Sequence, residues 1–136
     1  MKLEKFEDLH AWQEARALVG LVYRITMPSV GLDRDLVRQM RRAATSTMSN
    51  IAEGFARYSF KDSKQFFITS RGSLAELRSQ MYVALDQGYL TAVSAEELGG
   101  QIEIVGRLLW GLIRNARRQL AKGGSRSEQL VDLRSQ

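Results

Sequence analysis

The sequence predicts an all-α protein folded as an antiparallel up-down-up-down four-helix bundle. Its 136 residues include a single proline and are rich in Ala, Leu, Arg, Glu and Gln, which all favour helices. Apolar residues recur at spacings of three and four in four long segments, and only short connections separate these segments. Long helices joined by short connections pack as antiparallel neighbours, and this arrangement predicts the bundle.

The first helix is expected from about Asp8, as the N-cap, to about Met27, where Pro28 and Gly31 end it. Two apolar stripes at helical spacing define its buried side. The main stripe is Trp12, Ala15, Val19, Val22 and Thr26, and the second is Leu18, Leu21 and Ile25.

The second and third helices are bounded by capping signals. The second is expected to start near Asp33 and to end within residues 55–57. Ser59, followed three residues later by Asp62, resembles a capping box that opens the third helix, and Gly88 supplies its C-terminal stop.

The fourth helix is expected to open with a capping box at Ser94 and Glu97 and to end near Ala121. Its inward stripe is Leu98, Ile102, Val105, Leu109, Leu112, Ala116 and Leu120. The bundle domain therefore spans residues 1–122. Residues 123–136, which include the run GGSRSEQ, are expected to form a flexible C-terminal tail.

The first and last helices carry more apolar residues than a monomeric bundle requires. The surplus positions are Leu18, Leu21 and Ile25 in the first helix and Ile104, Leu108, Trp110 and Ile113 in the fourth. A helix with apolar residues beyond one stripe has a further face to bury, so the sequence favours a homo-oligomer.

Composition disfavours several classes of function. Cysteine is absent and His10 is the only histidine. The chain therefore lacks the thiolates and the several histidines that most metal sites and histidine-dependent catalytic sites require. No glycine-rich phosphate loop is present, and we expect neither a cofactor nor a metal. No apolar run reaches 18 residues and the start, MKLEKFEDLH, is charged, so a cytoplasmic protein without membrane contact is expected.

A set of polar residues falls on one side of the second helix, next to its apolar face. The spacing predicts a buried hydrogen-bonded network with residues of the third helix: Arg42, Ser46, Asn50 and Glu53 with Ser73 and Glu76. The paired carboxylates Glu53 and Glu76 also allow acid–base catalysis, but a structural network is the favoured interpretation, and we expect no enzyme.

The formal net charge is +5, and the segment 104–127 holds six basic residues and no acidic one. Basic residues also cluster on single faces of three helices, a pattern typical of phosphate contacts, although such a face can be merely solvated. The predicted nucleic-acid-binding residues are Arg34, Arg38, Arg41, Lys64, Arg71, Arg78, Arg107, Arg114, Arg117, Arg118 and Lys122. The nearest stacking candidates are Tyr58, Phe60 and Tyr82, so backbone or shape recognition is expected rather than base reading.

Several segments resemble one known family. They are FEDLHAWQEA, QMRRAATSTMSNIAEGFAR, SFKDSKQFF and SRGSLAELRSQMYVALDQGYL, and together they extend over roughly residues 6–120. They resemble the 23S rRNA intervening-sequence proteins, a family of four-helix bundles. The most specific elements are NIAEG at residues 50–54 and the pattern of Gly72, Ser73 and Glu76.

The resemblance implies a small bacterial bundle that assembles as a pentamer around a central channel, without enzymatic activity. A related branch, the accessory variability protein of diversity-generating retroelements, is a basic pentamer that binds nucleic acid and partners a reverse transcriptase. We therefore expect a ring-like homo-oligomer that binds structured RNA or RNA/DNA through phosphates. The alternative is a protein-interaction scaffold or an accessory subunit for a reverse transcriptase.

Overall fold

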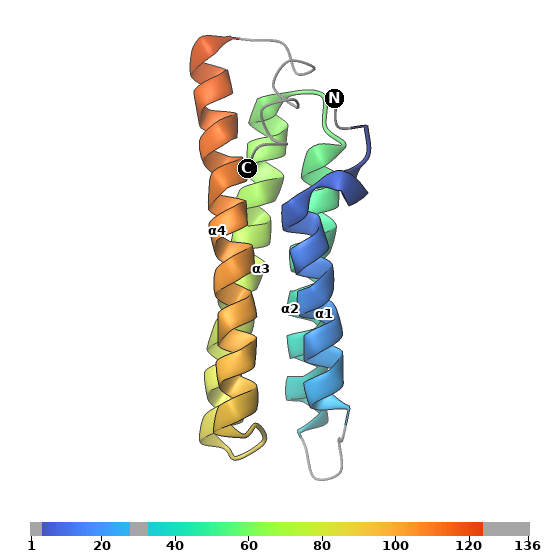
Figure 1. Cartoon of the computed structure of the whole chain (residues 1–136), viewed down its shortest axis with the longest axis vertical. Helices are drawn as coiled ribbons and strands as arrows, with labels where there is room; N and C mark the ends of the chain where they lie inside the picture. Colours follow the sequence, from blue (N-terminus) through green and yellow to red (C-terminus); the bar gives the residue numbers. More distant parts are fainter. Residues whose placement is uncertain (1–3, 28–32, 124–136) are drawn as a thin grey trace.

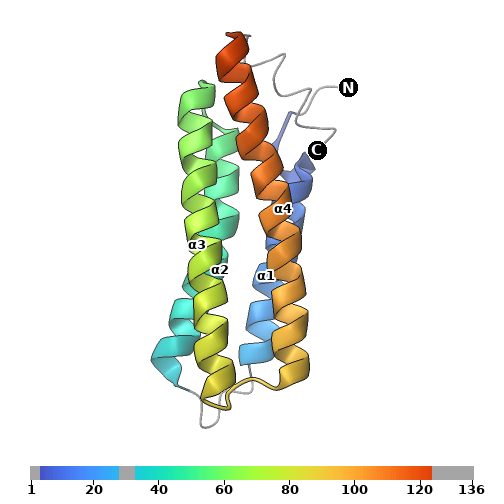
Figure 2. The ribbon, with the colours of Figure 1, turned by 90° about the vertical axis from the view of Figure 1, so that its left-hand side faces the viewer.

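The computed structural model describes residues 4–27 and 33–123. These residues form a short 3-10 helix, η1 (Phe6–Asp8), and four α-helices: α1 (His10–Thr26), α2 (Arg34–Phe55), α3 (Phe60–Asp86) and α4 (Ala92–Lys122). The helices run alternately down and up, with α1 and α4 on one side of the molecule and α2 and α3 on the other (Figures 1 and 2). The predicted four-helix bundle is therefore confirmed. The predicted roles of Pro28, Gly31 and the tail beyond Gly123 fall outside the described residues.

The predicted ends of α2 and α3 agree with the structure. The Asp33 side chain accepts a hydrogen bond from the backbone N–H of Asp35 at 3.0 Å, and the Ser59 hydroxyl accepts one from that of Asp62 at 3.2 Å. Each bond satisfies a backbone donor that has no partner inside the helix. Gly88 follows α3 with φ of 78°, a conformation that glycine adopts without steric cost.

The predicted N-caps of α1 and α4 are wrong. Asp8 belongs to η1, and the N-cap of α1 is Leu9, which is buried and whose side chain makes no capping bond. The α4 helix begins three residues earlier than expected, because Thr91 is its N-cap and accepts a hydrogen bond from the Ser94 N–H at 3.0 Å. Ser94 therefore lies inside the first turn.

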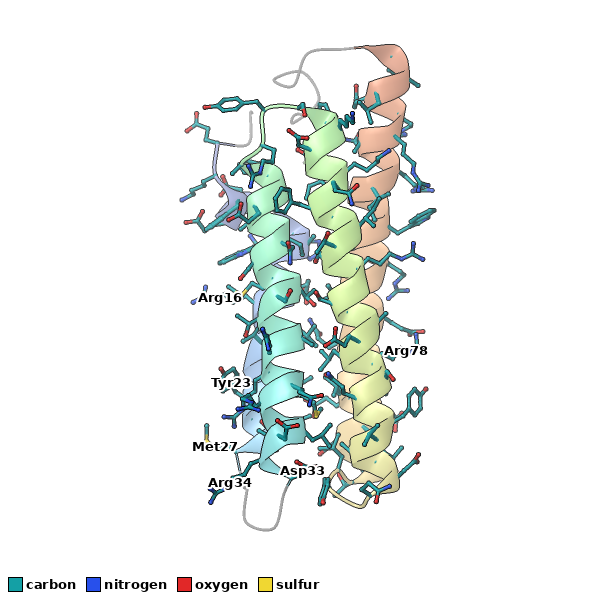
Figure 3. The ribbon with its side chains drawn as sticks, turned by 180° about the vertical axis from the view of Figure 1, so that it is seen from behind. Arg16, Tyr23, Met27, Asp33, Arg34 and Arg78 are labelled. Carbon is teal, nitrogen blue, oxygen red and sulfur yellow. The ribbon has the colours of Figure 1, made fainter. Side chains whose placement is uncertain are left out.

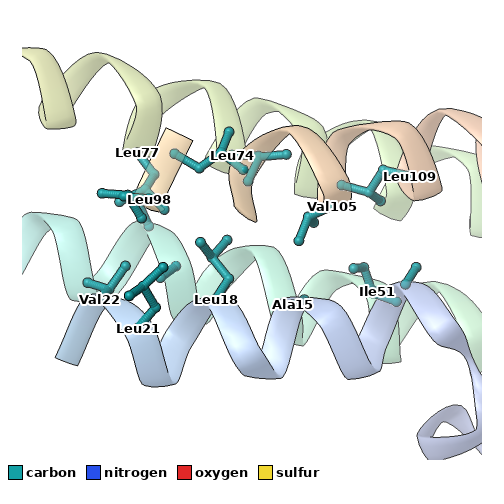
Figure 4. Close-up of a cluster of buried hydrophobic side chains, with 14 of the residues drawn as sticks. Ala15, Leu18, Leu21, Val22, Ile51, Leu74, Leu77, Leu98, Val105 and Leu109 are labelled. Carbon is teal, nitrogen blue, oxygen red and sulfur yellow. The ribbon is translucent and has the colours of Figure 1, made fainter. Parts of the chain in front are cut away.

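All four helices contribute to one apolar core (Figure 4). Leu18 and Leu21 of α1 and Ile113 of α4 are fully or nearly buried inside it. These residues were expected to be surplus, so the surplus does not by itself indicate a second chain. Leu120 is 42% exposed, contrary to the predicted inward stripe. It lies near the end of α4, which extends beyond the other helices (Figures 1 and 2).

Candidate nucleic-acid interface

Two of the six residues predicted to form a polar network, Ser46 and Ser73, meet between α2 and α3, and a third, Asn50, bonds to Ser46. The hydroxyls of Ser46 and Ser73 lie 2.8 Å apart, and each residue is half-buried. The Asn50 amide donates to the Ser46 carbonyl oxygen at 2.8 Å and to its hydroxyl at 3.1 Å. The Ser46–Ser73 bond links the two helices at one point near their middle, and the bonds of Asn50 stay within α2.

The other three members, Arg42, Glu53 and Glu76, do not join them, and the predicted enclosure is wrong for these residues. All three are exposed. Glu53 pairs instead with Arg57 of its own helix at 3.0 Å, and Glu76 accepts a long hydrogen bond of 3.4 Å from Gln80. Long charged side chains reach water from the edge of a helix interface, which avoids the cost of burying their charge.

The buried polar contacts between α2 and α3 come mainly from serines that donate to backbone. The Ser63 hydroxyl donates to the Gly54 carbonyl oxygen at 2.7 Å, and the Ser70 hydroxyl donates to that of Thr47 at 2.6 Å. Both serines are almost completely buried. Neither serine was predicted from the sequence as a polar contact. The available signal was a pair of serines seven residues apart among apolar neighbours.

The basic residues of α3 and α4 gather along one groove. This α3/α4 groove, of about 590 Å³, is lined by Arg71, Leu74, Ala75, Arg78, Ile102, Glu103, Gly106, Arg107, Trp110 and Arg114. Two of its arginines come from each helix, and all four were predicted as nucleic-acid contacts. The sequence placed each pair on one face of its own helix, and the fold brings the two pairs together.

The four arginines of the α3/α4 groove are not neutralised by neighbouring carboxylates. Within residues 4–27 and 33–123, none of them takes part in an ion pair, and Glu103 is the only acidic residue that lines the groove. Several cations that face one depression attract a polyanion, because each phosphate can be approached by more than one guanidinium.

Trp110 lies among these arginines and was missed as a functional candidate. The guanidinium carbon of Arg71 is 5.2 Å from the centre of the Trp110 ring, and that of Arg117 is 5.4 Å from it. The sequence analysis counted Trp110 only as surplus apolar surface. Its spacing from Arg107, Arg114 and Arg117 on one helix was the signal that could have identified it.

A second basic groove lies along α2 and reaches α1. This α1/α2 groove, of about 940 Å³, is lined by Tyr23, Arg34, Val37, Arg38, Arg41, Arg42, Thr45, Ser46 and Ser49. The Arg41 guanidinium lies over the Tyr23 ring at 4.5 Å, and its Nε donates to the hydroxyl of the buried Thr26 at 3.0 Å. Figure 3 shows Tyr23 and Arg34 on the opposite side of the bundle from Arg78, so the two grooves face different directions.

The remaining predicted residues lie outside both grooves. Arg118 makes a long hydrogen bond of 3.5 Å to Asn115, Lys64 is half-buried on α3, and Lys122 ends α4. Among the predicted stacking candidates, Phe60 is buried and therefore unsuitable, whereas Tyr58 and Tyr82 are exposed.

Two further properties bear on chemistry. No cluster of three or more His, Cys, Asp or Glu residues suited to a metal ion occurs in the part of the chain that the structure describes. None of the described helices combines the length and the apolar character needed to cross a membrane.

Comparisons with known proteins agree with the architecture. The family model described as 23S rRNA-intervening sequence protein matches residues 7–111. A crystal structure of a protein of unknown function from the S23 ribosomal protein family of Bacteroides thetaiotaomicron is similar in fold, with a TM-score of 0.70 and 16% identity. The similarity covers 76% of this chain and 97% of that one. A search among curated proteins found no match. Because the family model covers most of the chain, this protein belongs to the 23S rRNA-intervening sequence protein family.

Proposed function

We propose that this protein is a non-enzymatic helical bundle that binds nucleic acid through phosphate contacts in the α3/α4 groove. The observation that supports this most directly is the convergence of Arg71, Arg78, Arg107 and Arg114 on one groove without an ion pair among the described residues. Arginine suits this role because its guanidinium is always charged and presents several N–H donors to phosphate oxygens.

The test is the salt dependence of binding to a labelled RNA, measured by fluorescence anisotropy. Replacing Arg78 and Arg114 together by Gln removes one cation from each helix of the groove. We expect weaker binding at every salt concentration and a slope of log K against log salt that is shallower by about two, since each lost phosphate contact lowers it by about one.

A matched control is the double replacement of Arg16 and Arg24 by Gln, which changes the net charge equally. Both residues lie on α1, outside the two grooves, and Arg24 is held by Glu97 at 2.8 Å. The control should bind nearly as the wild type does. If both double variants lose affinity equally, only the net charge matters, and the α3/α4 groove is not the site.

We further propose that the chain self-associates through α3. The outward face of this helix carries small and apolar residues at alternating spacings of four and three: Ile68, Gly72, Ala75, Ser79 and Tyr82. All of them are exposed in the single chain. Small side chains at heptad spacing allow another helix to approach closely. A homo-oligomer, for which the family resemblance implies a pentamer, would cover the part of this face that lies away from the α3/α4 groove, whose lining includes Ala75.

The α1/α2 groove supports an alternative proposal, an accessory role beside a protein partner such as a reverse transcriptase. The groove is separate from the α3/α4 groove and combines Val37 with the ring of Tyr23 and four arginines. A chain with two basic grooves on opposite sides can hold nucleic acid on one side and a partner on the other. Co-purification of this protein with a reverse transcriptase, lost when Tyr23 is replaced by Ala, would support that role.

A further inference from the structure

We propose that the α3/α4 groove binds unpaired nucleic acid, with a base stacked on Trp110 while the groove arginines hold the adjacent phosphates. This inference rests on the function proposed above and names the class of nucleic acid. It differs from the expectation of backbone or shape recognition, because that expectation considered only Tyr58, Phe60 and Tyr82 as stacking candidates.

The indole ring of Trp110 is accessible from solvent. Trp110 is 38% exposed at the surface of the groove, although tryptophan is usually well buried. The other tryptophan, Trp12, is 9% exposed and packs against the ring of Phe6, with centroids 5.0 Å apart. The core therefore accounts for Trp12 and leaves part of the Trp110 ring available to a ligand.

Two guanidinium groups lie next to the indole ring of Trp110. Arg71 from α3 and Arg117 from α4 both lie over the Trp110 ring, at 5.2 and 5.4 Å. A guanidinium that stacks on an indole keeps its N–H groups free at the edge, where they can donate to phosphate. A base that enters the groove displaces one guanidinium from the ring or stacks on the guanidinium itself, since arginine planes also stack on bases.

The α3/α4 groove has an apolar floor beside Trp110. Gly106 lies one turn before it on α4, and a Cβ atom at Gly106 would meet only the Leu74 side chain, at 3.6 Å. Glycine therefore leaves open a floor that is otherwise made of Leu74, Ala75 and Ile102. An apolar floor next to an exposed indole accommodates the flat face of a base.

These features favour a single strand over a duplex. In a duplex the base faces are covered by their neighbours, and only the phosphates and groove edges are available to a protein. Single-strand sites typically combine a basic groove along the backbone with aromatic rings that stack on bases, irrespective of sequence. The α3/α4 groove has both components within a few helical turns.

The direct test uses tryptophan fluorescence. In the Trp12→Phe variant, Trp110 is the only tryptophan of the chain. Titration with single-stranded oligo(U) or oligo(dT) at low salt should quench its emission to a saturating level. A duplex with the same number of phosphates should leave the emission unchanged. Similar quenching by both oligomers would assign the contact to the base, and quenching by oligo(U) alone would add a contact to the ribose hydroxyl.

The second test compares Trp110→Leu with Trp110→Phe. The Leu variant should lose single-strand affinity on the order of tenfold, which is within the range for one stacked base. The Phe variant, which retains a ring, should lose less. Duplex affinity should be the same for both variants and the wild type. Thermal melting followed by circular dichroism checks that each variant is folded.

The possible failures are distinguishable. If no nucleic acid binds at any salt concentration, the proposed function fails and this inference fails with it. If RNA binds with the expected salt dependence but Trp110 emission does not change, only the stacking inference is wrong. A Trp110→Leu variant that melts earlier yet binds single strands normally would assign Trp110 to a purely structural contact between α3 and α4.

Discussion

Single atoms decide how closely α2 and α3 approach. Gly54 is buried, and a Cβ atom built on it would lie 2.5 Å from Cε1 and 2.8 Å from Cδ1 of Phe67. Phe67 is itself 1% exposed, so its ring has little room to move away. The glycine of the NIAEG segment is therefore explained by packing, without reference to any ligand.

We predict that Gly54→Ala lowers the free energy of unfolding by about 1 kcal/mol. The overlap with Phe67 costs about 1–3 kcal/mol in a well-packed core, and the better helix propensity of alanine offsets about 1 kcal/mol at most. Urea unfolding followed by circular dichroism measures the change. An unchanged or raised midpoint would show that the α2–α3 contact relaxes easily.

At the residue scale, the sequence revealed polar positions more reliably than it revealed their partners. Spacing alone predicted that Ser46 and Ser73 meet between the helices, as they do, whereas the hydrogen bonds of Asn50 go to Ser46 of its own helix. It also placed Glu53 and Glu76 there, because periodicity does not distinguish the buried centre of a helix contact from its solvated edge. The rotamer of a long side chain makes that difference, and it depends on neighbours from another helix.

At the scale of the helices, the apolar periodicity and the capping and helix-breaking residues correctly predicted the number and order of the helices. They did not predict where α1 and α4 begin. Leu9 is the N-cap of α1, and Leu90 directly precedes Thr91, the N-cap of α4. Both leucines are buried. Burial of these leucines determines where the chain enters each helix, and the sequence pattern that suggested Asp8 and Ser94 contains no information about it. Tertiary packing therefore overrode the local capping signals.

A second prediction concerns the first turns of α4. Gly100 is exposed, and a Cβ atom there would meet nothing within 4 Å. Replacing it by Ala should raise the free energy of unfolding by about 0.5–1 kcal/mol, because glycine loses more backbone entropy than alanine in a helix. The midpoint of urea unfolding reports this change. Gly100→Ala also serves as the clash-free control for Gly54→Ala, and a decrease in its stability would contradict the argument.

At the scale of the whole molecule, the sequence identified basic faces but not grooves. Arg71 and Arg78 were assigned to one face of α3, and Arg107 and Arg114 to one face of α4. Only the packing of α3 against α4 shows that both faces open into the same depression, with Trp110 between them. The surplus apolar residues of α1 and α4 had suggested an interface with a second chain. Several of them, including Leu18, Leu21 and Ile113, belong instead to the core of the single chain.

Self-association gives a prediction at this scale. Ser79→Glu places a charge in the middle of the exposed α3 stripe, and burial of that charge in an interface would be costly. We expect the mass measured by light scattering to fall from a multiple of 15.4 kDa toward that of one chain. Ser49→Glu, an equivalent change at an exposed position of α2, should leave the mass unaltered. A wild-type protein that runs as a single chain would exclude the assembly.

The serines between α2 and α3 also restrict how the molecule can deform. Their two bonds advance by seven residues along α3, from Ser63 to Ser70, and return by seven along α2, from Gly54 to Thr47. Any sliding of one helix past the other breaks both bonds together. The α2–α3 pair is therefore held in register, and the two helices are expected to move as one unit.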